Sequence, residues 1–240
     1  VQNNLANTYL RLGEREAGTA NLERAASLYR VALAEGELEK ASSGVTWSNL
    51  GIALHSLAER GNDLKLYAEA RQAFANALAV RDKADDPLGW AADTLNAANL
   101  ELDLAQRNND IAGIDVAASE IGEALKVARD EGLPAYQVLQ PEYNLYARSS
   151  FEGPLADLCI DQGLGVVSYY ALASGFLSGK YRSESDFSKS VRGGDMGEYL
   201  NNRGRAILAA LERVAYRQNA LLAEIALAWL MTRPGLTAPI

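Results

Sequence analysis

A repeat in the first half of the 240-residue chain constrains the fold more than any other sequence feature. Three segments, which begin at Asn3, Ser48 and Leu95, align without gaps. The columns that match are Asn4, Asn49 and Asn96; Leu12, Leu57 and Leu104; and Arg15, Arg60 and Arg107. The spacings are 45 and then 47 residues in every column. Chance rarely gives such agreement, so the first half is predicted to contain three copies of one structural unit.

Each copy is predicted to be a pair of helices. A second amphipathic segment follows the first in every copy, and these segments end at Leu33, Leu78 and Leu125, with the same two spacings. Small and large apolar residues alternate at helical intervals within them: Ala26, Tyr29 and Leu33 in the first copy, and Ala70, Phe74 and Leu78 in the second. One helical hairpin cannot cover its own apolar face, so the hairpins are expected to stack.

This pattern resembles the tetratricopeptide repeat family, in its longer-helix form, over residues 1–131. The family's period is usually about 34 residues, so the similarity lies in the pattern rather than in the consensus. The resemblance implies an α-solenoid that binds a protein or peptide on its concave side. The candidate contact residues are Asn3, Asn7, Asn49 and Asn96. Alternatively, these asparagines cap or bridge helices within the stack.

The charge is distributed unevenly. Residues 1–131 hold 13 Lys and Arg against 21 Asp and Glu, whereas residues 132–240 hold 10 of each, so the net charge of −8 lies in the first part. An acidic surface repels phosphate backbones, which argues against nucleic acid as a partner. No apolar run approaches the length of a membrane span, and no secretory signal is found, so a cytoplasmic location without membrane association is expected.

Cysteine, histidine and tryptophan side chains can take part in catalysis or binding, but in this chain they are predicted to be structural. The lone Cys159 cannot form an internal disulfide and is expected to pack in the core. His55 is the only histidine, which gives it no second histidine for metal binding or nucleophilic catalysis, so no metal site is predicted. Trp47 and Trp90 stand near the start of successive repeats and are expected to pack.

After about residue 132 the pattern changes to an alternation of strands and helices. The predicted strands are "YQVLQ" (136–140, expected to be buried), "LGVVSYY" (164–170) and "LTAPI" (236–240). The predicted helices are "FEGPLADLCIDQG", ended by Gly163, then "LNNRGRAILAALERVAYRQN", and finally "LLAEIALAWLMTRPG", stopped by Pro234 and Gly235. Such strand–helix–strand units pair in parallel and build either an open doubly wound sheet or a (β/α)8 barrel.

Three longer motifs decide between these two folds. The segments "LQPEYNLY", "GVVSYYALASGFLSGKYR" and "AEIALAWLMTRPGLTAPI" closely resemble the aldo-keto reductase family, over about residues 119–240. The predicted fold is therefore mainly α with a small parallel α/β part: an α-solenoid of helical hairpins over 1–131, then the C-terminal half of a (β/α)8 barrel over 132–240. Because "SEIGEALKVARDEGLP" also resembles the family's helix before its sixth strand, the boundary is blurred over 117–132.

The resemblance implies a nicotinamide cofactor, NADPH, and assigns residues to it. Gln140 would hydrogen-bond the carboxamide and Tyr169 would stack on the nicotinamide ring. The following loop would lie along the pyrophosphate, with Tyr170, Leu172, Ala173, Ser174 and Lys180 as its contact residues. The family commonly has Ser-Pro where this chain has Tyr170-Ala171. The alternative is that all seven residues serve only packing.

The family's catalytic tetrad of Asp, Tyr, Lys and His lies in the first half of its barrel, where this chain has helical repeats. No segment like "DTAxxYG" occurs, so no catalytic residue is predicted, and the strand "LTAPI" is not followed by the family's 2′-phosphate loop. The chain is thus expected to be a fusion or fragment with weak or absent NADPH binding. Self-association through an open barrel edge is a further expectation. The alternative is an NADPH-dependent oxidoreductase of aldehydes and ketones, if the missing half is supplied.

Overall fold

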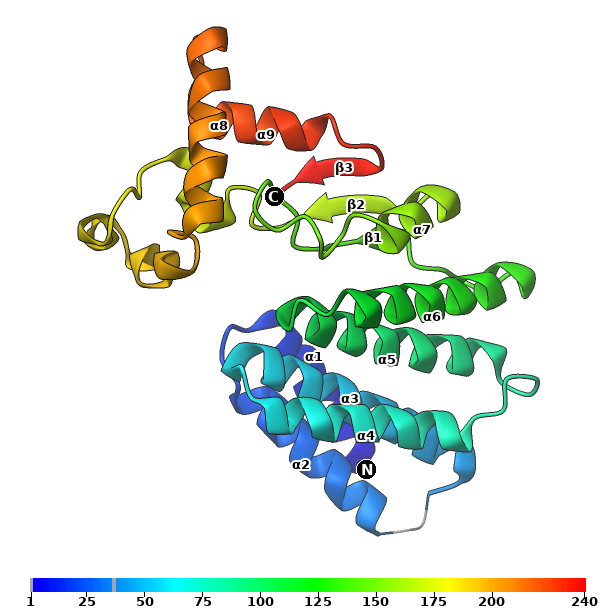
Figure 1. Cartoon of the computed structure of the whole chain (residues 1–240). Helices are drawn as coiled ribbons and strands as arrows, with labels where there is room; N and C mark the ends of the chain where they lie inside the picture. Colours follow the sequence, from blue (N-terminus) through cyan, green and yellow to red (C-terminus); the bar gives the residue numbers. More distant parts are fainter. Residues whose placement is uncertain (1, 36–37) are drawn as a thin grey trace. The chain divides into compact units, whose positions relative to one another are not determined.

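The computed structural model describes residues 2–35 and 38–240, except for the side chains of residues 191, 192 and 195. The chain divides into two compact units, Val1–Ala135 and Tyr136–Ile240. The first, called the helical unit below, contains six α-helices (Figure 1): α1 (Gln2–Arg15), α2 (Ala20–Ala34), α3 (Lys40–Gly61), α4 (Leu64–Val80), α5 (Pro87–Arg107) and α6 (Ile111–Asp130). No described helix is both long and apolar enough to cross a bilayer.

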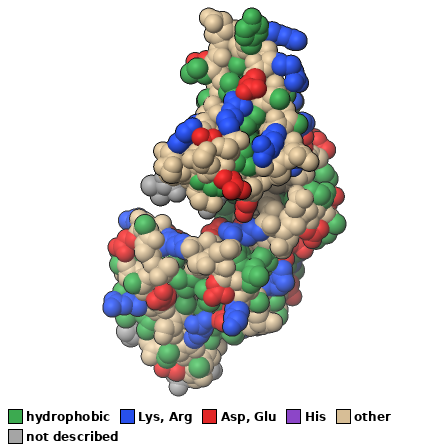
Figure 2. All heavy atoms as spheres, turned by 60° about the vertical axis from the view of Figure 1, so that its left-hand side comes forward, with side chains coloured by type: hydrophobic (Ala, Val, Ile, Leu, Met, Phe, Trp, Pro, Cys, Tyr) green, Lys and Arg blue, Asp and Glu red, His purple; other side chains and the backbone are tan. Residues whose placement is uncertain are grey.

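The helices of this unit pack as three successive hairpins. Helix α1 packs on α2, α3 on α4 and α5 on α6, and neighbouring hairpins meet through α2 with α3 and through α4 with α5. The six helices and their pairing agree with the sequence prediction of two helices per repeated segment. On the face shown in Figure 2, acidic and basic side chains are interspersed, so the acidic surplus forms no single patch there.

Burial in the three hairpins follows the spacing of the sequence repeat. Two positions of the first helix are small and buried in every hairpin: Ala6, Gly51 and Ala98; and Gly13, Ala58 and Ala105. Four positions of the second helix are also buried in every hairpin: Leu22, Tyr67 and Ile114; Ala25, Ala70 and Ala117; Tyr29, Phe74 and Ile121; and Ala32, Ala77 and Ala124. The 45- and 47-residue spacings thus mark equivalent packing positions.

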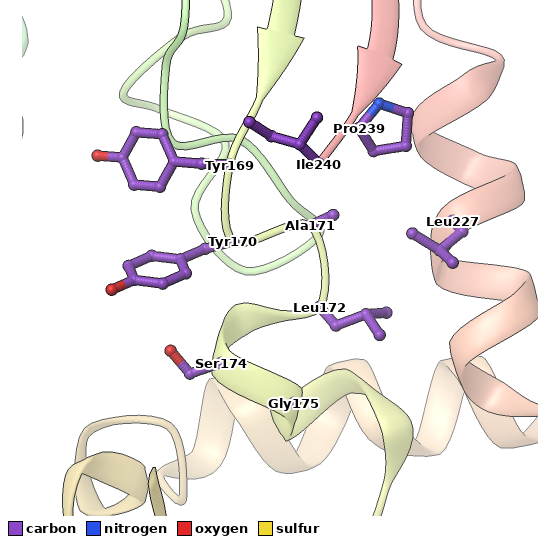
Figure 3. Close-up of a pocket in the computed structure, with 9 residues that line it drawn as sticks. All are labelled: Tyr169, Tyr170, Ala171, Leu172, Ser174, Gly175, Leu227, Pro239 and Ile240. Carbon is purple, nitrogen blue, oxygen red and sulfur yellow. The ribbon is translucent and has the colours of Figure 1, made fainter. Parts of the chain in front are cut away.

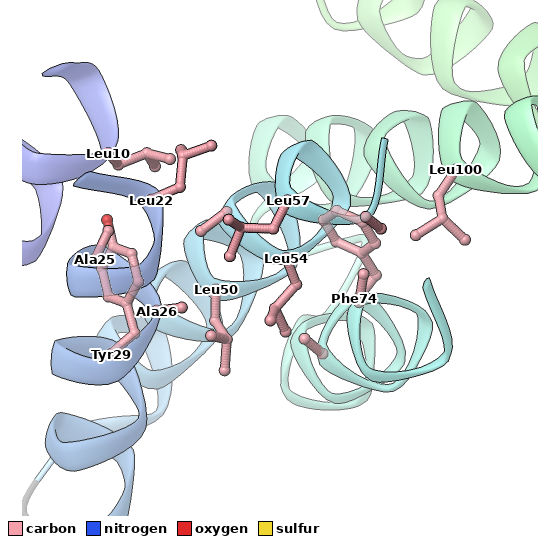
Figure 4. Close-up of a cluster of buried hydrophobic side chains, with 14 of the residues drawn as sticks. Leu10, Leu22, Ala25, Ala26, Tyr29, Leu50, Leu54, Leu57, Phe74 and Leu100 are labelled. Atoms are coloured by element: carbon pink, nitrogen blue, oxygen red, sulfur yellow. The ribbon is translucent and has the colours of Figure 1, made fainter. Parts of the chain in front are cut away.

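Small residues let the helices of a hairpin approach closely. A Cβ atom placed on Gly51 of α3 would lie 2.5 Å from Cε1 of Phe74 on α4. Phe74 is buried in a cluster that includes Leu54 and Leu100 (Figure 4). The cluster therefore extends from the second hairpin to α5 in the third.

The turns within the second and third hairpins share their chemistry. Asn62 and Asn109 adopt positive φ of 50° and 52° at the ends of α3 and α5. The following aspartates cap the next helices: Asp63 accepts a hydrogen bond from Lys65 N at 2.8 Å, and Asp110 accepts one from Gly113 N at 3.1 Å. Asn-Asp is suited to these positions, because asparagine tolerates the left-handed region and aspartate is a good N-cap.

Removing a cap gives a first testable expectation. Asp63→Ala should lower the free energy of unfolding of the helical unit by about 1 kcal/mol, because the amide of Lys65 loses its acceptor. Urea denaturation followed by far-ultraviolet circular dichroism measures the change. Asp85→Ala removes an exposed aspartate that caps no helix and is the matched control. An equal loss in both variants would show that the cap does not account for the effect.

Three of the four asparagines proposed as contact residues, Asn3, Asn7 and Asn49, form hydrogen bonds between neighbouring helices. Asn3 donates to Thr46 Oγ1 at 2.8 Å, and the Oδ1 atom of Asn7 accepts from Tyr29 at 2.7 Å and from Asn49 at 3.0 Å. These bonds tie α1 to α2 and α3, which is the bridging role left open by the sequence. Binding of a partner by this surface stays a prediction.

The second unit, called the β/α unit below, contains a three-stranded parallel sheet in the order β1-β2-β3 (Figure 1). Its elements are β1 (Val138–Leu139), α7 (Pro154–Gln162), β2 (Gly165–Ser168), the 3₁₀ segments η1 (Ala173–Ser178), η2 (Glu184–Lys189) and η3 (Val191–Glu198), α8 (Asn202–Gln218), α9 (Leu222–Met231) and β3 (Leu236–Pro239). All three strands coincide with the predicted ones, and the described residues contain no earlier strand.

Most local features of this unit agree with the sequence prediction. Gly163 ends α7 with a left-handed φ of 66°, and Cys159 on α7 is fully buried, which raises the pKa of its thiol to about 11. The predicted burial of the first strand is wrong, because Val138 is 54% exposed and Leu139 is only half-buried. The reason is that β1 is an edge strand, paired on one side only with β2.

Candidate functional site

The candidate site is built at the carboxyl ends of the parallel strands. Tyr169 follows β2 directly, and its backbone N–H donates to the carbonyl of Pro141 at 3.0 Å. Tyr169 also pairs with Glu142 in an isolated parallel bridge. At the end of β3, the N–H of Ile240 donates to the carbonyl of Ser168 at 2.8 Å. Pairing therefore continues beyond the regular strands and fixes the backbone at which Tyr169 begins a loop.

A pocket with a volume of about 670 Å³ opens at these strand ends (Figure 3). Its lining residues come from the loop after β2, from α9 and from the end of β3: Tyr169, Tyr170, Ala171, Leu172, Ser174, Gly175, Leu227, Pro239 and Ile240. The lining is mainly apolar, and its volume lies within the usual range for small-molecule sites. The described lining contains no Asp, Glu, His, Lys or Arg.

Two tyrosine rings stand at one side of this pocket. The side chains of Tyr169 and Tyr170 point in the same direction from the loop, away from Leu227 and Pro239 (Figure 3). Their ring centroids are 5.1 Å apart at an interplanar angle of 67°, an edge-to-face pair. Tyr170 is 50% exposed and Tyr169 is partly buried, so the pair offers aromatic surface to a planar ligand.

The loop that lines the pocket is held in an uncommon backbone conformation. Tyr170, Ala173 and Ser174 have positive φ values of 52°, 48° and 54°, followed by Gly175 at 96°. Left-handed residues other than glycine are uncommon and tend to gather at functional sites. The loop is supported by a hydrogen bond from the Nδ2 atom of the buried Asn144 to the carbonyl of Tyr170, at 3.0 Å.

The structure brings together most of the residues predicted to contact a cofactor. Tyr169, Tyr170, Leu172 and Ser174 line the pocket, and Ala173 is buried within the same loop. Gln140 is exposed at the end of β1 and is not part of the lining, nor is the exposed Lys180. Lys180 nevertheless lies near the loop, since its Nζ atom is 3.2 Å from the position that a Cβ on Gly175 would take.

Five lining residues were not predicted. Ala171 and Gly175 belong to the same motif as the predicted loop residues, and Pro239 and Ile240 end the strand predicted over 236–240. Leu227 comes from the middle of α9, where its helical pattern indicates only packing. The motif could have suggested the first four residues, but only the packing of α9 near this loop identifies Leu227.

A cluster of Glu142, Glu198 and Tyr199 beside the loop was also not predicted from the sequence. Burial raises the pKa of Glu142, and the negative charge of Glu198 adds to the rise. Burial also raises the pKa of Tyr199 to about 12, with Glu142 and Glu198 as further causes, whereas hydrogen bonding with Ser174 opposes the shift. Tyr199 therefore stays protonated near neutral pH and connects this group to the pocket through Ser174.

Parallel strands linked through helices, with a pocket at their carboxyl ends, define a β/α protein of the kind that places its functional site at this edge. Comparison with known proteins identifies the particular group: residues 97–240 match the model of the aldo/keto reductase family. The chain belongs to this family. The match begins within α5, earlier than the start near residue 119 predicted from the motifs, and it spans both compact units.

Several curated proteins resemble part of the chain. A probable voltage-gated potassium channel subunit beta of Arabidopsis thaliana is 30% identical over 136 residues, which cover 52% of this chain and 39% of the relative. An aldo-keto reductase of Babesia bovis is 32% identical over 123 residues (48% and 43%), and norsolorinic acid reductase B of Aspergillus parasiticus is 28% identical over 130 residues (52% and 33%). The chain spans about two fifths of the length of the curated relatives it matches. No solved structure matches it significantly.

Proposed function

We propose that the β/α unit is the nicotinamide-facing part of an NADPH-dependent aldo-keto reductase. The observation that carries this proposal is the pocket at the strand ends, with Tyr169 at the point where β2 becomes the loop. Family membership supports it, because the pocket-lining loop belongs to the matched region. When bound, the cofactor supplies a hydride to a carbonyl substrate.

The residues present fit the nicotinamide end of such a cofactor. The ring of Tyr169 offers a face for stacking, and the exposed Gln140 has an amide that can pair with a carboxamide. The left-handed backbone at Ala173 and Ser174 and the ammonium of Lys180 are groups of the kind that hold phosphate. Tyr170 and Leu172 complete the apolar wall. These roles extend the resemblance noted in the sequence to positions on the pocket.

We do not propose that these 240 residues catalyse carbonyl reduction by themselves. The described pocket lining holds no carboxylate, imidazole or ammonium group. General acid–base catalysis needs such a group, or an activated hydroxyl, within hydrogen-bond reach of the reacting oxygen. We infer that the family's Asp, Tyr, Lys and His tetrad would have to come from outside this sequence. The chain would then be a fusion or a fragment, and carbonyl reduction is its activity only when that half is supplied.

We propose that the helical unit is an array of tetratricopeptide-like hairpins that binds a protein or peptide. The recurrence of buried positions at the spacing of the sequence repeat favours this function over a catalytic one. The lone, buried Cys159 is compatible with the reducing cytoplasm, where we place the protein. Self-association through the exposed edge strand β1 is a further proposal.

Binding of NADPH by the purified chain tests the cofactor proposal. Fluorescence titration should give weak saturable binding, and Tyr169→Ala should raise the Kd at least about fivefold, since stacking of a planar ring on an aromatic side chain contributes about 1–3 kcal/mol. Tyr216→Ala is the matched control, because Tyr216 on α8 is 90% exposed and does not line this pocket. Binding that is unchanged in Tyr169→Ala would refute the assigned site.

A further inference from the structure

Side chains able to bind a metal ion gather between α3 and α5 of the helical unit. His55 and Glu59 stand four residues apart on α3, so they share one face of that helix. Asp103 comes from α5. One potential ligand atom of each residue lies within 4.8 Å of the other two. This cluster was not predicted from the sequence, because no second histidine accompanies His55 and because Asp103 is distant from it along the chain.

The imidazole of His55 has an unused nitrogen in this cluster. Its Nε2 atom is buried and makes no hydrogen bond in the part of the chain that the structure describes. The Oδ2 atom of Asp103 is 3.5 Å away, beyond the usual length of a hydrogen bond. Buried polar atoms nearly always have a hydrogen-bond partner. The unpaired imidazole nitrogen beside a carboxylate therefore points to a bound ligand that satisfies it. With its proton on Nδ1, the ring offers the Nε2 lone pair to a cation.

Asp103 is held in place in a way that suits a ligand. The hydroxyl of Tyr67 donates to its Oδ2 atom, and Nε of Arg107 donates to its Oδ1 atom at 2.9 Å. Outer contacts of this kind commonly orient a metal-binding carboxylate, and each oxygen keeps a further lone pair.

The size of the cluster is close to that of a metal site. Tetrahedral zinc with bonds of about 2.0–2.2 Å to nitrogen or oxygen places its ligand atoms about 3.3–3.6 Å apart. The Nε2 atom of His55 and the Oδ2 atom of Asp103 are 3.5 Å apart, and all three ligand atoms lie within 4.8 Å of one another, so closing around an ion needs a movement of up to about one ångström. Glu59 is exposed and makes no ion pair with any described residue, which leaves its carboxylate able to rotate inward. The charge of Arg107 opposes a cation and limits the affinity.

We propose that His55, Glu59 and Asp103 bind one divalent transition-metal ion, with zinc as the best-suited probe. One imidazole nitrogen and two carboxylates are a donor set that such ions accept, with water in the remaining positions. The ion ties the first helix of the second hairpin to the first helix of the third. This site lies in the helical unit and does not depend on the proposed reductase function.

The test uses the full-length, tag-free chain stripped of metal with a chelator. Calorimetric titration with Zn²⁺ should show one ion per chain, and Co²⁺ in its place should give the visible absorption of a low-symmetry site with nitrogen and oxygen ligands. Glu59→Gln and His55→Gln should each weaken Zn²⁺ binding at least about tenfold. Glu23→Gln, which changes an exposed glutamate on α2, should leave the affinity unchanged. Cys159→Ser should also leave it unchanged, because that thiol is buried and its pKa is raised to about 11.

Circular dichroism of Glu59→Gln establishes that its helices are intact. If His55→Gln fails to fold, Zn²⁺ binding by Glu59→Gln still tests the proposed site. Binding lost in Glu59→Gln and retained in Glu23→Gln supports the proposal. Absence of binding in the wild-type chain, or equal binding in Glu59→Gln and in the wild-type chain, overturns it.

Discussion

Phe74→Ala should lower the free energy of unfolding of the helical unit by about 3–5 kcal/mol, the usual cost of removing a large aromatic side chain from a core. Phe74 is only 1% exposed and packs at the closest approach of α3 and α4, opposite Gly51. The same buried cluster includes Leu100 of α5. The cavity left by the ring would therefore weaken both the second hairpin and its contact with the third.

Urea denaturation followed by circular dichroism measures this loss. Leu64→Ala is the matched control on the same helix, because Leu64 is 68% exposed and its truncation should change stability by less than about 0.5 kcal/mol. A loss below about 1 kcal/mol in Phe74→Ala would mean that the hairpins do not depend on this cluster. The double variant Gly51→Ala with Phe74→Ala should be less destabilised than the sum of its parts, because the added methyl group fills space that the ring has left.

The helical unit was predictable because its information is local and repeated. The repeat indicated two helices for each copy, and the alternation of small and large apolar residues at helical intervals pointed to buried positions such as Tyr29 and Phe74. Recurrence alone did not, because Leu12, which belongs to a recurring column, is 42% exposed. The turns are local too, since Asn62 and Asp63 contain both the left-handed residue and the cap. Each of these features needs only a few neighbouring residues.

The strands were located correctly, but their burial was not. Burial of a strand depends on whether it has a neighbour on each side, and an apolar pentapeptide such as 136–140 does not contain that information. Since β1 is at the edge of the sheet, Val138 remains exposed. Four of the pocket's lining residues were named from the loop motif and its resemblance to the family, and Leu227 was missed because it reaches the loop through the packing of α9.

The cluster around His55 shows a second limit of sequence reasoning. Glu59 could have been found from the four-residue spacing. Tyr67 lies on α4 of the same hairpin and Asp103 on α5 of the next one, so only the packing of these helices brings them to the site. The expectation of no metal site rested on the count of histidines alone and did not consider a carboxylate brought from α5. A cluster that forms between repeated units is not visible within the sequence of any one of them.

The purified chain should not reduce aldehydes or ketones with NADPH above the uncatalysed rate. Hydride transfer to a carbonyl requires a proton for the developing alkoxide, and a positioned acid typically contributes 10²–10⁴-fold to the rate. In the proposed site Tyr169 would hold the nicotinamide ring, but the described lining of the pocket offers no carboxylate, imidazole or ammonium as that acid. The lining does offer the hydroxyls of Tyr169, Tyr170 and Ser174, but it contains no Lys or Arg that would activate them. Beside the pocket, Tyr199 is connected to it through Ser174, and burial raises the pKa of Tyr199 to about 12, so this hydroxyl gives up its proton reluctantly.

Following the absorbance of the reduced nicotinamide with a panel of carbonyl compounds checks the expectation, with Tyr169→Ala and Tyr199→Phe measured beside the wild-type chain. Turnover that is lost in Tyr169→Ala would contradict it, and additional loss in Tyr199→Phe would identify Tyr199 as the proton donor of a reductase site that works without the tetrad.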